Sequence, residues 1–151
     1  MCCTRFALIV VALAVPRVAF SECVTLSLYE VVNSAAVVFT GTVTHVTPNT
    51  ASEWESERAT FDVDRVWRGP VTRRFVIYSV APYRAEHFQF TAGMRYIVLA
   101  HVQTAEEREQ FGFARSTPPT FGVGACGDGT REYSRFKTEL TQLGRGTAPA
   151  R

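Results

Sequence analysis

Residues 36–47, AVVFTGTVTHVT, have the composition of a β-strand. β-Branched and aromatic side chains dominate this segment, and apolar and polar residues alternate after Gly41, as on a strand with one buried face. We expect a bulge or strong bend at Gly41, because glycine inside a strand offers no side chain for packing. The surrounding domain is therefore expected to be mainly β.

Four further strands are predicted downstream. Strands over 58–67 and 71–80 flank the tight connection Arg68-Gly69-Pro70 and should form a hairpin. Val66 breaks the alternation of the first of them, which predicts a bulge near Asp64 and Arg65. Residues 94–102 form a nearly continuous apolar strand, suited to a sheet covered on both faces, and residues 110–115 form a short fifth strand.

Helices are predicted at both ends of this strand series. Ser27 and Glu30 have the spacing of a capping box, which together with an apolar stripe predicts a short helix over 27–34. Residues 132–143 carry apolar side chains at offsets of three and four before Gly144, which predicts an amphipathic C-terminal helix. Segments 48–56, 82–93 and 116–130 are expected to be loops, and 145–151 a flexible tail.

Five strands with a helix at each end and no βαβ alternation predict a mainly β, closed or partly open five-stranded barrel. The chain has 151 residues, of which 46% are hydrophobic and 20% charged, which fits one compact domain. Alternation predicts that its core includes Phe39, Val43, Phe61, Val63, Phe75, Ile77, Tyr96 and Val98.

The first 21 residues have the pattern of a secretory signal peptide. Arg5 precedes the apolar run 6–15, and small residues stand at Ala19 and Ser21. That run of about ten residues is shorter than the roughly 20 that span a bilayer, so an uncleaved anchor is the weaker alternative. Cleavage after Ser21 would start a mature domain at Glu22, extending over 22–144, in a secreted, periplasmic or cell-surface protein.

Cleavage would remove Cys2 and Cys3 and leave Cys23 and Cys126. In an oxidising compartment two such cysteines are expected to be bridged, with two unpaired thiols as the alternative. The bridge would close a loop of about 100 residues, for which chain entropy gives an upper figure of about 4–5 kcal/mol. Two cysteines offer too few ligands for a zinc site.

Charge and motif patterns disfavour several function classes. Cleavage also removes two of the 16 basic residues, which leaves 14 against 14 acidic ones, and a neutral chain lacks the electrostatic attraction that nucleic acids require. His45, His87 and His101 lack the spacing of a metal site. The segment 122–127 lacks the strand and helix context of a phosphate-binding loop. No catalytic residues, metal or cofactor are predicted, and the protein is not expected to be an enzyme.

The remaining polar and aromatic features have simpler interpretations. Asp62 and Asp64 share one side of a strand and are expected on a solvated outer face. Residues 106–109 are expected to be a charged loop or to protect a sheet edge. The aromatic loop residues Tyr83, His87, Phe88 and Phe90 either pack over one barrel end or form a recognition surface.

The order of these segments resembles that of the netrin-like module, to which the tissue inhibitors of metalloproteinases belong, especially its short bacterial exported forms. The resemblance covers about 23–143 and rests on four pieces: residues 36–43, the strand 61–67 with Arg68-Gly69-Pro70, the Gly93-x-x-Tyr96-Ile97-Val98-Leu99-Ala100 strand, and a late cysteine before a helix ending in Leu-Gly. It implies a five-stranded OB-like (netrin-like) barrel.

The family pattern has two bridges that begin at a Cys-x-Cys near the mature N-terminus. The resemblance pairs Cys23 with Cys126, whereas both halves of the other bridge are missing, at Ser21 and near Glu86. In the animal inhibitors the α-amine of the first cysteine chelates the zinc of the protease. Here Glu22 would be the first residue, so we do not expect zinc-chelating inhibition.

The resulting hypothesis is an exported, non-catalytic binding module whose partner is a protein, a protease being one case, with no membrane association after signal cleavage. Candidate partner-binding residues are Glu22, Cys23, Val24, Thr25, Tyr83 and Phe88. The alternatives are an OB-type binder of oligosaccharide or nucleic acid and, less favoured, an enzyme of unknown type.

Overall fold

The computed structural model describes residues 27–50, 56–80, 88–114, 118–124, 126 and 129–151. Within these residues five strands close into a barrel in the order β1 (Val37–Pro48), β2 (Ser56–Arg68), β3 (Arg74–Val80), β5 (Phe121–Val123) and β4 (Arg95–Val102), and β4 pairs with β1. Neighbouring strands are antiparallel except for the parallel pair β3 and β5. The short strand β6 (Arg131–Glu132) extends the sheet beyond β4.

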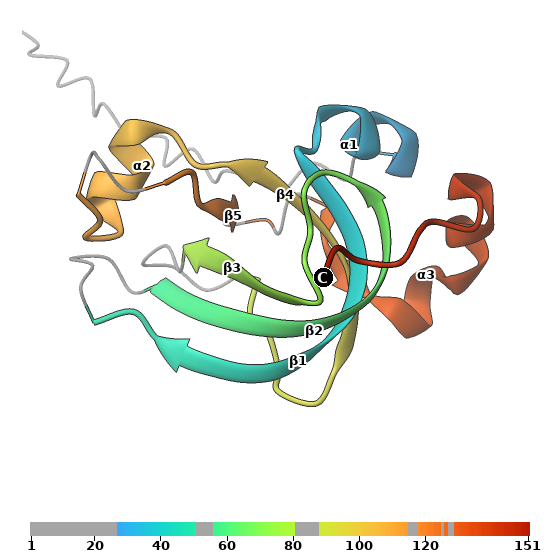
Figure 1. The fold of residues 1–151 in the computed structure, drawn as a ribbon, viewed down its shortest axis with the longest axis horizontal. Coiled ribbons are helices and arrows are strands. Elements are labelled where there is room, and N and C mark those ends of the chain that lie inside the picture. The colour runs from blue at the N-terminus through green and yellow to red at the C-terminus, as the bar shows by residue number, and fades with distance from the viewer. Residues whose placement is uncertain (1–26, 51–55, 81–87, 115–117, 125, 127–128) are drawn as a thin grey trace, which may run out of the picture.

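A helix flanks the barrel near each end of the described chain (Figure 1). The helix α1 (Leu28–Ser34) leads into β1, and α3 (Tyr133–Leu140) with the 3₁₀ turn η2 (Thr141–Leu143) follows β6. The predicted mainly β, five-stranded OB-like barrel with a short N-terminal and a C-terminal helix is thus confirmed. No helix in the described ranges has the length and apolarity needed to cross a membrane.

The bends of β1 and β2 occur where the sequence predicts them. The register of the two strands shifts between Thr40 and Gly41, and Asp64 is the additional residue on β2 at this point. A Cβ atom on Gly41 would lie 2.8 Å from the carbonyl oxygen of Asp62. Glycine therefore permits the close approach of the two backbones, and both predicted bulges are confirmed.

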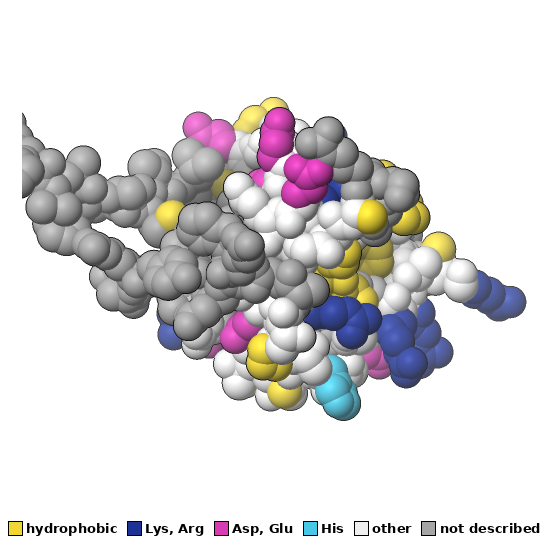
Figure 2. Space-filling view, turned by 90° about the vertical axis from the view of Figure 1, so that its left-hand side faces the viewer, with side chains coloured by type: hydrophobic (Ala, Val, Ile, Leu, Met, Phe, Trp, Pro, Cys, Tyr) yellow, Lys and Arg dark blue, Asp and Glu magenta, His cyan; other side chains and the backbone are white. Residues whose placement is uncertain are grey.

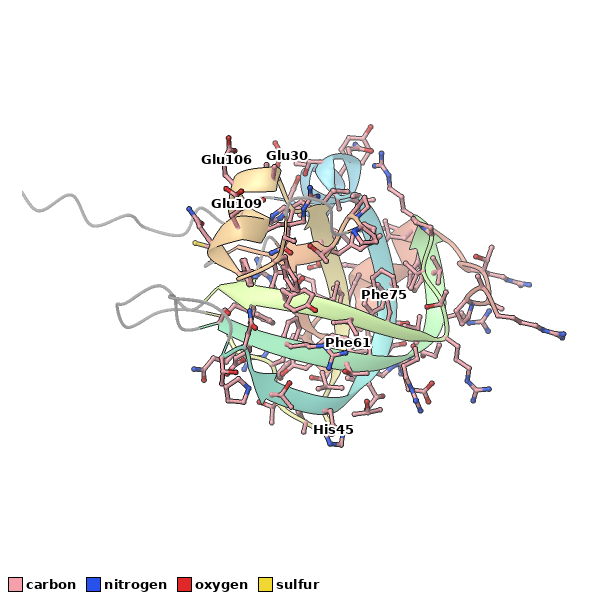
Figure 3. The ribbon with its side chains drawn as sticks, turned by 60° about the vertical axis from the view of Figure 1, so that its left-hand side comes forward. Glu30, His45, Phe61, Phe75, Glu106 and Glu109 are labelled. Atoms are coloured by element: carbon pink, nitrogen blue, oxygen red, sulfur yellow. The ribbon has the colours of Figure 1, made fainter. Side chains whose placement is uncertain are left out.

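The strand β4 is covered on both faces, as its apolar run predicts. Tyr96 and Val98 point into the barrel, and Ile97 and Leu99 pack outside it against the two flanking helices. The eight predicted core residues all belong to the barrel interior, with Phe75 partly buried and the others at most 4% exposed. Figure 3 shows Phe61 and Phe75 inside the ring of strands.

The helix α1 begins as its sequence predicts. The Ser27 side chain accepts a hydrogen bond from the Glu30 amide, and the Glu30 carboxylate accepts one from the Ser27 amide at 3.0 Å. At the other end, the Arg68 guanidinium donates to the carbonyl oxygens of Val32 and Asn33 at 3.0 and 2.9 Å. Those interactions satisfy helix-end groups that would otherwise lack partners.

The predicted fifth strand at 110–115 is wrong. Gln110 instead ends the helix α2 (Ala105–Gln110), which begins at a second capping box made by Thr104 and Glu107, and Phe111 and Gly112 form a turn. The charged residues 106–109 are therefore helical rather than a loop. The true fifth strand, β5, lies in the glycine-rich segment that was expected to be irregular, and a Cβ atom on Gly122 would lie within 3.0–3.2 Å of three Gln103 atoms.

The segment 145–151 is not a loose tail, and this expectation is also wrong. Thr147 and Val66 exchange two main-chain hydrogen bonds of 2.7 and 2.9 Å. Further along, Ala150 donates to Val71 at 3.0 Å and accepts from Arg73 at 3.1 Å. The strand β3 starts at Arg74 rather than at 71, and the predicted β2–β3 hairpin is confirmed.

Candidate functional site

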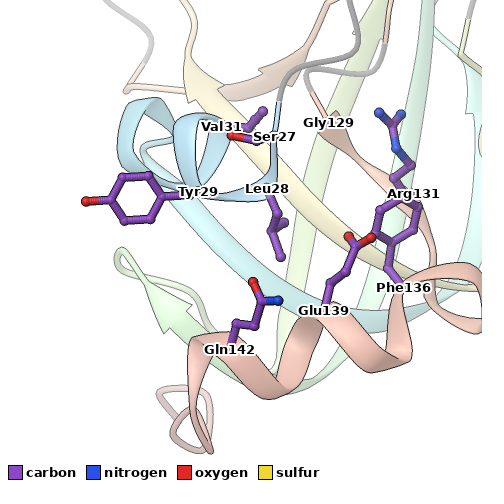
Figure 4. Close-up of a pocket in the computed structure, with 9 residues that line it drawn as sticks. All are labelled: Ser27, Leu28, Tyr29, Val31, Gly129, Arg131, Phe136, Glu139 and Gln142. Atoms are coloured by element: carbon purple, nitrogen blue, oxygen red, sulfur yellow. The ribbon is translucent and has the colours of Figure 1, made fainter.

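A pocket of about 400 Å³ lies between α1 and α3, beside the connection that leads into β6. Figure 4 shows Leu28 pointing from α1 toward α3, and Glu139 and Gln142 pointing toward α1, whereas Tyr29 is directed outward. Its lining residues are Ser27, Leu28, Tyr29, Val31, Gly129, Arg131, Phe136, Glu139 and Gln142. We refer to these residues as the α1–α3 pocket.

The pocket combines an apolar floor with a polar rim. Leu28, Val31 and Phe136 belong to the apolar cluster between the helices and the outer face of β4. The Arg131 guanidinium lies 5.4 Å from the centre of the Phe136 ring, which holds a positive charge at the rim. Glu139 and Gln142 supply a carboxylate and an amide on the opposite side. The lining therefore offers apolar contact together with both signs of charge.

Gly129, which precedes β6, allows the backbone to lie close to Val31 of α1. Its φ of +88° lies in the left-handed region, and a Cβ atom there would be 2.7 Å from a methyl group of Val31. A residue with a side chain would strain the backbone and displace α1. The wall of the pocket at this point thus depends on glycine.

The mouth of the pocket includes the first described residue, Ser27. Its hydroxyl and amide both donate to the Glu30 carboxylate, and these hydrogen bonds hold the pKa of Glu30 below its ordinary value. The carboxylate therefore remains charged at neutral pH and fixes the start of α1. The chain that precedes Ser27 contains the predicted partner-binding residues 22–25.

The predicted site residues are only partly covered by the structure. Residues 22–25, among them Cys23, and Tyr83 lie outside the described residues. Cys126 lies exposed in a turn. Its predicted pairing with Cys23 and the signal-peptide cleavage stay predictions.

Phe88 is described and is half-buried. Its ring centre lies 4.9 Å from that of Phe90 and 5.9 Å from that of Tyr96, both in edge contact. Phe90 in turn contacts Phe61 inside the barrel at 5.1 Å. Two roles are expected for the aromatic loop residues. Phe88 and Phe90 have the first of them, packing against the barrel core.

The rim residues of the pocket are not predicted from the sequence. Phe136 was part of the predicted amphipathic stripe, but periodicity alone does not show that its face remains partly open. Arg131, Glu139 and Gln142 belong to segments whose spacing resembles no binding motif. The one sequence feature that points to this region is the capping box of Ser27 and Glu30, which predicts that α1 begins shortly after residues 22–25.

Polar clusters elsewhere in the described residues have structural partners. Asp62 is paired with Arg73 at 3.6 Å, and Asp64 accepts from Thr40 and pairs with Arg95. The two carboxylates thus lie on an outer face, as expected. His101 contacts Glu107 at 3.3 Å. Among the described residues no group of three His, Cys, Asp or Glu side chains could hold a metal ion.

The outer face of β2 and β3 is the surface on which OB barrels bind oligonucleotides and oligosaccharides. Here the ring of Tyr78 is in edge contact with Phe111 and Phe113, at 5.9 and 5.0 Å between centres. The face shown in Figure 2 carries both basic and acidic side chains. The Tyr78 ring, which could stack on a base or sugar, is thus already packed against Phe111 and Phe113.

No protein-family model and no curated protein matches this chain.

Proposed function

We propose that this chain is an exported, non-catalytic binding module of the netrin-like kind, and that its partner is a protein. The observation that carries the proposal is the barrel order β1-β2-β3-β5-β4, closed by β4 on β1, with α1 before it and α3 after it. The sequence resemblance implies a five-stranded OB-like barrel, and this barrel is of that kind. Fold alone does not determine function, so the site must support the rest of the argument.

The α1–α3 pocket is the surface proposed to bind the partner. Protein interfaces combine a buried apolar centre with a polar rim, and enrichment in arginine and aromatic residues is common among them. Leu28 and Phe136 supply the apolar centre, and Arg131 lies against the Phe136 ring. Residues 22–25 precede this surface directly in the chain. We propose that a partner held by the pocket also contacts residues 22–25.

The position of the pocket also supports the proposed Cys23–Cys126 bridge. Ser27 and Gly129 both line the pocket, four residues after Cys23 and three after Cys126 respectively. An extended chain covers at most about 3.3–3.6 Å per residue, so both cysteines can reach the same region. The bridge would hold residues 22–25 beside the pocket.

The alternative of an OB-type binder of oligosaccharide or nucleic acid has less support. Tyr78 is already packed against Phe111 and Phe113. The proposed mature chain has balanced charges, whereas binding to single strands needs a positively charged groove.

Photo-crosslinking tests the proposed function. A photoreactive amino acid replaces Gln142 at the rim of the pocket or, as a control, His45, which lies on the opposite side of the barrel from α1 (Figure 3). In the exported fraction we expect a defined protein adduct from position 142 and none from position 45. Equal adducts from both positions, or adducts only with oligosaccharide or nucleic acid, would reject the proposal.

If the partner proves to be a zinc protease, the mode of inhibition can be separated from binding. We expect weak inhibition through the α-amine, because Glu22 would precede Cys23 and the first bridge of the family pattern is absent. The assay compares the mature chain with an N-terminally acetylated form. Potent inhibition that acetylation abolishes would show that the amine chelates zinc after all.

A further inference from the structure

The segment 145–151 occupies a sheet edge formed by residues 66–73. In Figure 1 the chain leaves α3 and runs back across the barrel to the end marked C. Thr147 pairs in antiparallel fashion with Val66, and Ala150 pairs in parallel fashion with Thr72. Four main-chain hydrogen bonds of 2.7–3.1 Å hold the segment. We call residues 66–73 the receiving edge.

Side chains of the segment contribute little to this attachment. Thr147, Ala148 and Ala150 are exposed, and Pro149 is only half-buried. The bonds are mainly between backbones, apart from those of the Thr147 hydroxyl to the Val66 carbonyl and of the Trp67 indole to the Gly144 carbonyl. An attachment of this type stabilises a short strand without anchoring it in the core.

The receiving edge selects for glycine at one position. Gly146 has a φ of +60°, and a Cβ atom there would lie 3.0 Å from the Trp67 ring and 3.1 Å from the Val66 carbonyl oxygen. An extended segment from another protein would need a glycine in the same register with Thr147 and Ala150. The same segment of a second copy meets this requirement by identity.

The connection to α3 can change direction at low cost. Gly144 follows η2 with a φ of +76°, and a Cβ atom there would meet nothing within 4 Å. Glycine has access to several other backbone conformations. The segment can therefore leave its own barrel without disturbing α3.

From these observations we propose that two copies of the chain form a dimer by exchanging residues 145–151, each segment pairing with the receiving edge of the other copy. Exchange of an identical element keeps every hydrogen bond of the closed monomer and produces a closed, two-fold interface. The proposal concerns self-association and does not depend on the function proposed above.

The test uses the intact purified chain and two synthetic peptides, GRGTAPAR, which corresponds to residues 144–151, and the same peptide with Gly146→Val. Sedimentation velocity measures the dimer fraction over a concentration series. We expect the dimer to increase with concentration and to dissociate on addition of the native peptide but not of the Gly146→Val peptide. A chain that stays monomeric throughout, or a dimer that the two peptides affect equally, overturns the proposal.

A second measurement examines the receiving edge alone. The chain without residues 145–151 is titrated with each fluorescent peptide, after circular dichroism has confirmed its fold. We expect the native peptide to bind more tightly than the Gly146→Val peptide by about tenfold or more, which corresponds to about 1.4 kcal/mol. Equal affinities would contradict the glycine selection. If the shortened chain does not fold, the intact-chain experiment decides.

Discussion

The hydroxyl of Thr130 makes hydrogen bonds to both main-chain groups of Leu99, accepting from the amide at 3.0 Å and donating to the carbonyl oxygen at 3.1 Å. Along this edge of β4, Ile97 pairs with β6 and His101 pairs with β5. A side chain thus takes the place of a strand in the gap between β6 and β5. The edge of β4 therefore stays hydrogen-bonded between its pairings with β6 and β5.

Replacing the Thr130 hydroxyl should destabilise the barrel more than its small size suggests. Thr130→Val keeps the shape but leaves a buried amide and a buried carbonyl without partners, each worth about 1–3 kcal/mol. We expect a loss of about 2–4 kcal/mol in the free energy of unfolding, measured by urea denaturation. Thr130→Ser keeps the hydroxyl and should lose less. Equal losses for the two variants would show that these hydrogen bonds contribute nothing.

Phe61 is the central test of the barrel core. Its side chain is fully buried and makes edge contacts with Phe39 at 5.4 Å and Phe90 at 5.1 Å. Phe61→Ala should lower the free energy of unfolding by about 3–5 kcal/mol. The control is Tyr29→Ala, because Tyr29 is 78% exposed, and its effect should stay within about 0.5 kcal/mol. Similar denaturation midpoints for both variants would contradict the strand register.

The sequence predicts most of the barrel because local signals and burial agree there. Alternation in β1, the bulge at Gly41 and the two-sided burial of β4 all follow from patterns of period two. The capping box at Ser27 and Glu30 likewise predicts the start of α1. In these segments the local preference and the tertiary environment favour the same structure.

The prediction fails where tertiary contacts outweigh local propensity. β5 is three residues long and contains Gly122, which packs against Gln103, a contact that no local pattern reveals. The second capping box, at Thr104 and Glu107, precedes residues 106–109, whose charge favours a loop, and the helix α2 is therefore not predicted. Residues 146–150 carry small side chains, and the segment is held mainly by main-chain hydrogen bonds to the receiving edge, with one further bond from the Thr147 hydroxyl.

The candidate site could be predicted only in outline. The sequence indicates two helices and an N-terminal segment, but not that Leu28 and Phe136 face each other across a pocket. That arrangement depends on how α1 and α3 pack on the outer face of β4. Packing of this kind follows from the closed barrel rather than from any motif.

Acid should weaken the start of α1 through Glu30. Hydrogen bonds from the Ser27 hydroxyl and amide lower the pKa of Glu30 in the folded chain, so its stabilising effect is present above the ordinary glutamate pKa of 4.5 and is lost as the pH falls through the lowered value. As the pH falls below 4.5, we expect the free energy of unfolding of the native chain to decrease more steeply than that of the Glu30→Gln variant. Urea midpoints across the acidic range measure this. Parallel curves for the two chains would count against the interaction.

Intact-mass analysis of the exported chain tests its processing. We expect a mature protein that begins at Glu22, with one Cys23–Cys126 bridge, so that reduction adds the mass of two hydrogen atoms. An unreduced chain that already carries both hydrogens would show two free thiols. A chain that retains residues 1–21 would contradict signal cleavage and with it the proposed localisation.

The most direct test of the central claim is the affinity of the cross-linked partner for two charge variants on neighbouring turns. Gln142→Arg alters the rim of the α1–α3 pocket, and Thr138→Arg alters an exposed residue of α3 that does not line it. Both variants should keep the melting temperature of the native chain. We predict that Gln142→Arg weakens binding by about tenfold or more and that Thr138→Arg leaves it unchanged. Equal affinities for both variants and the native chain would contradict the claim that this pocket binds the partner.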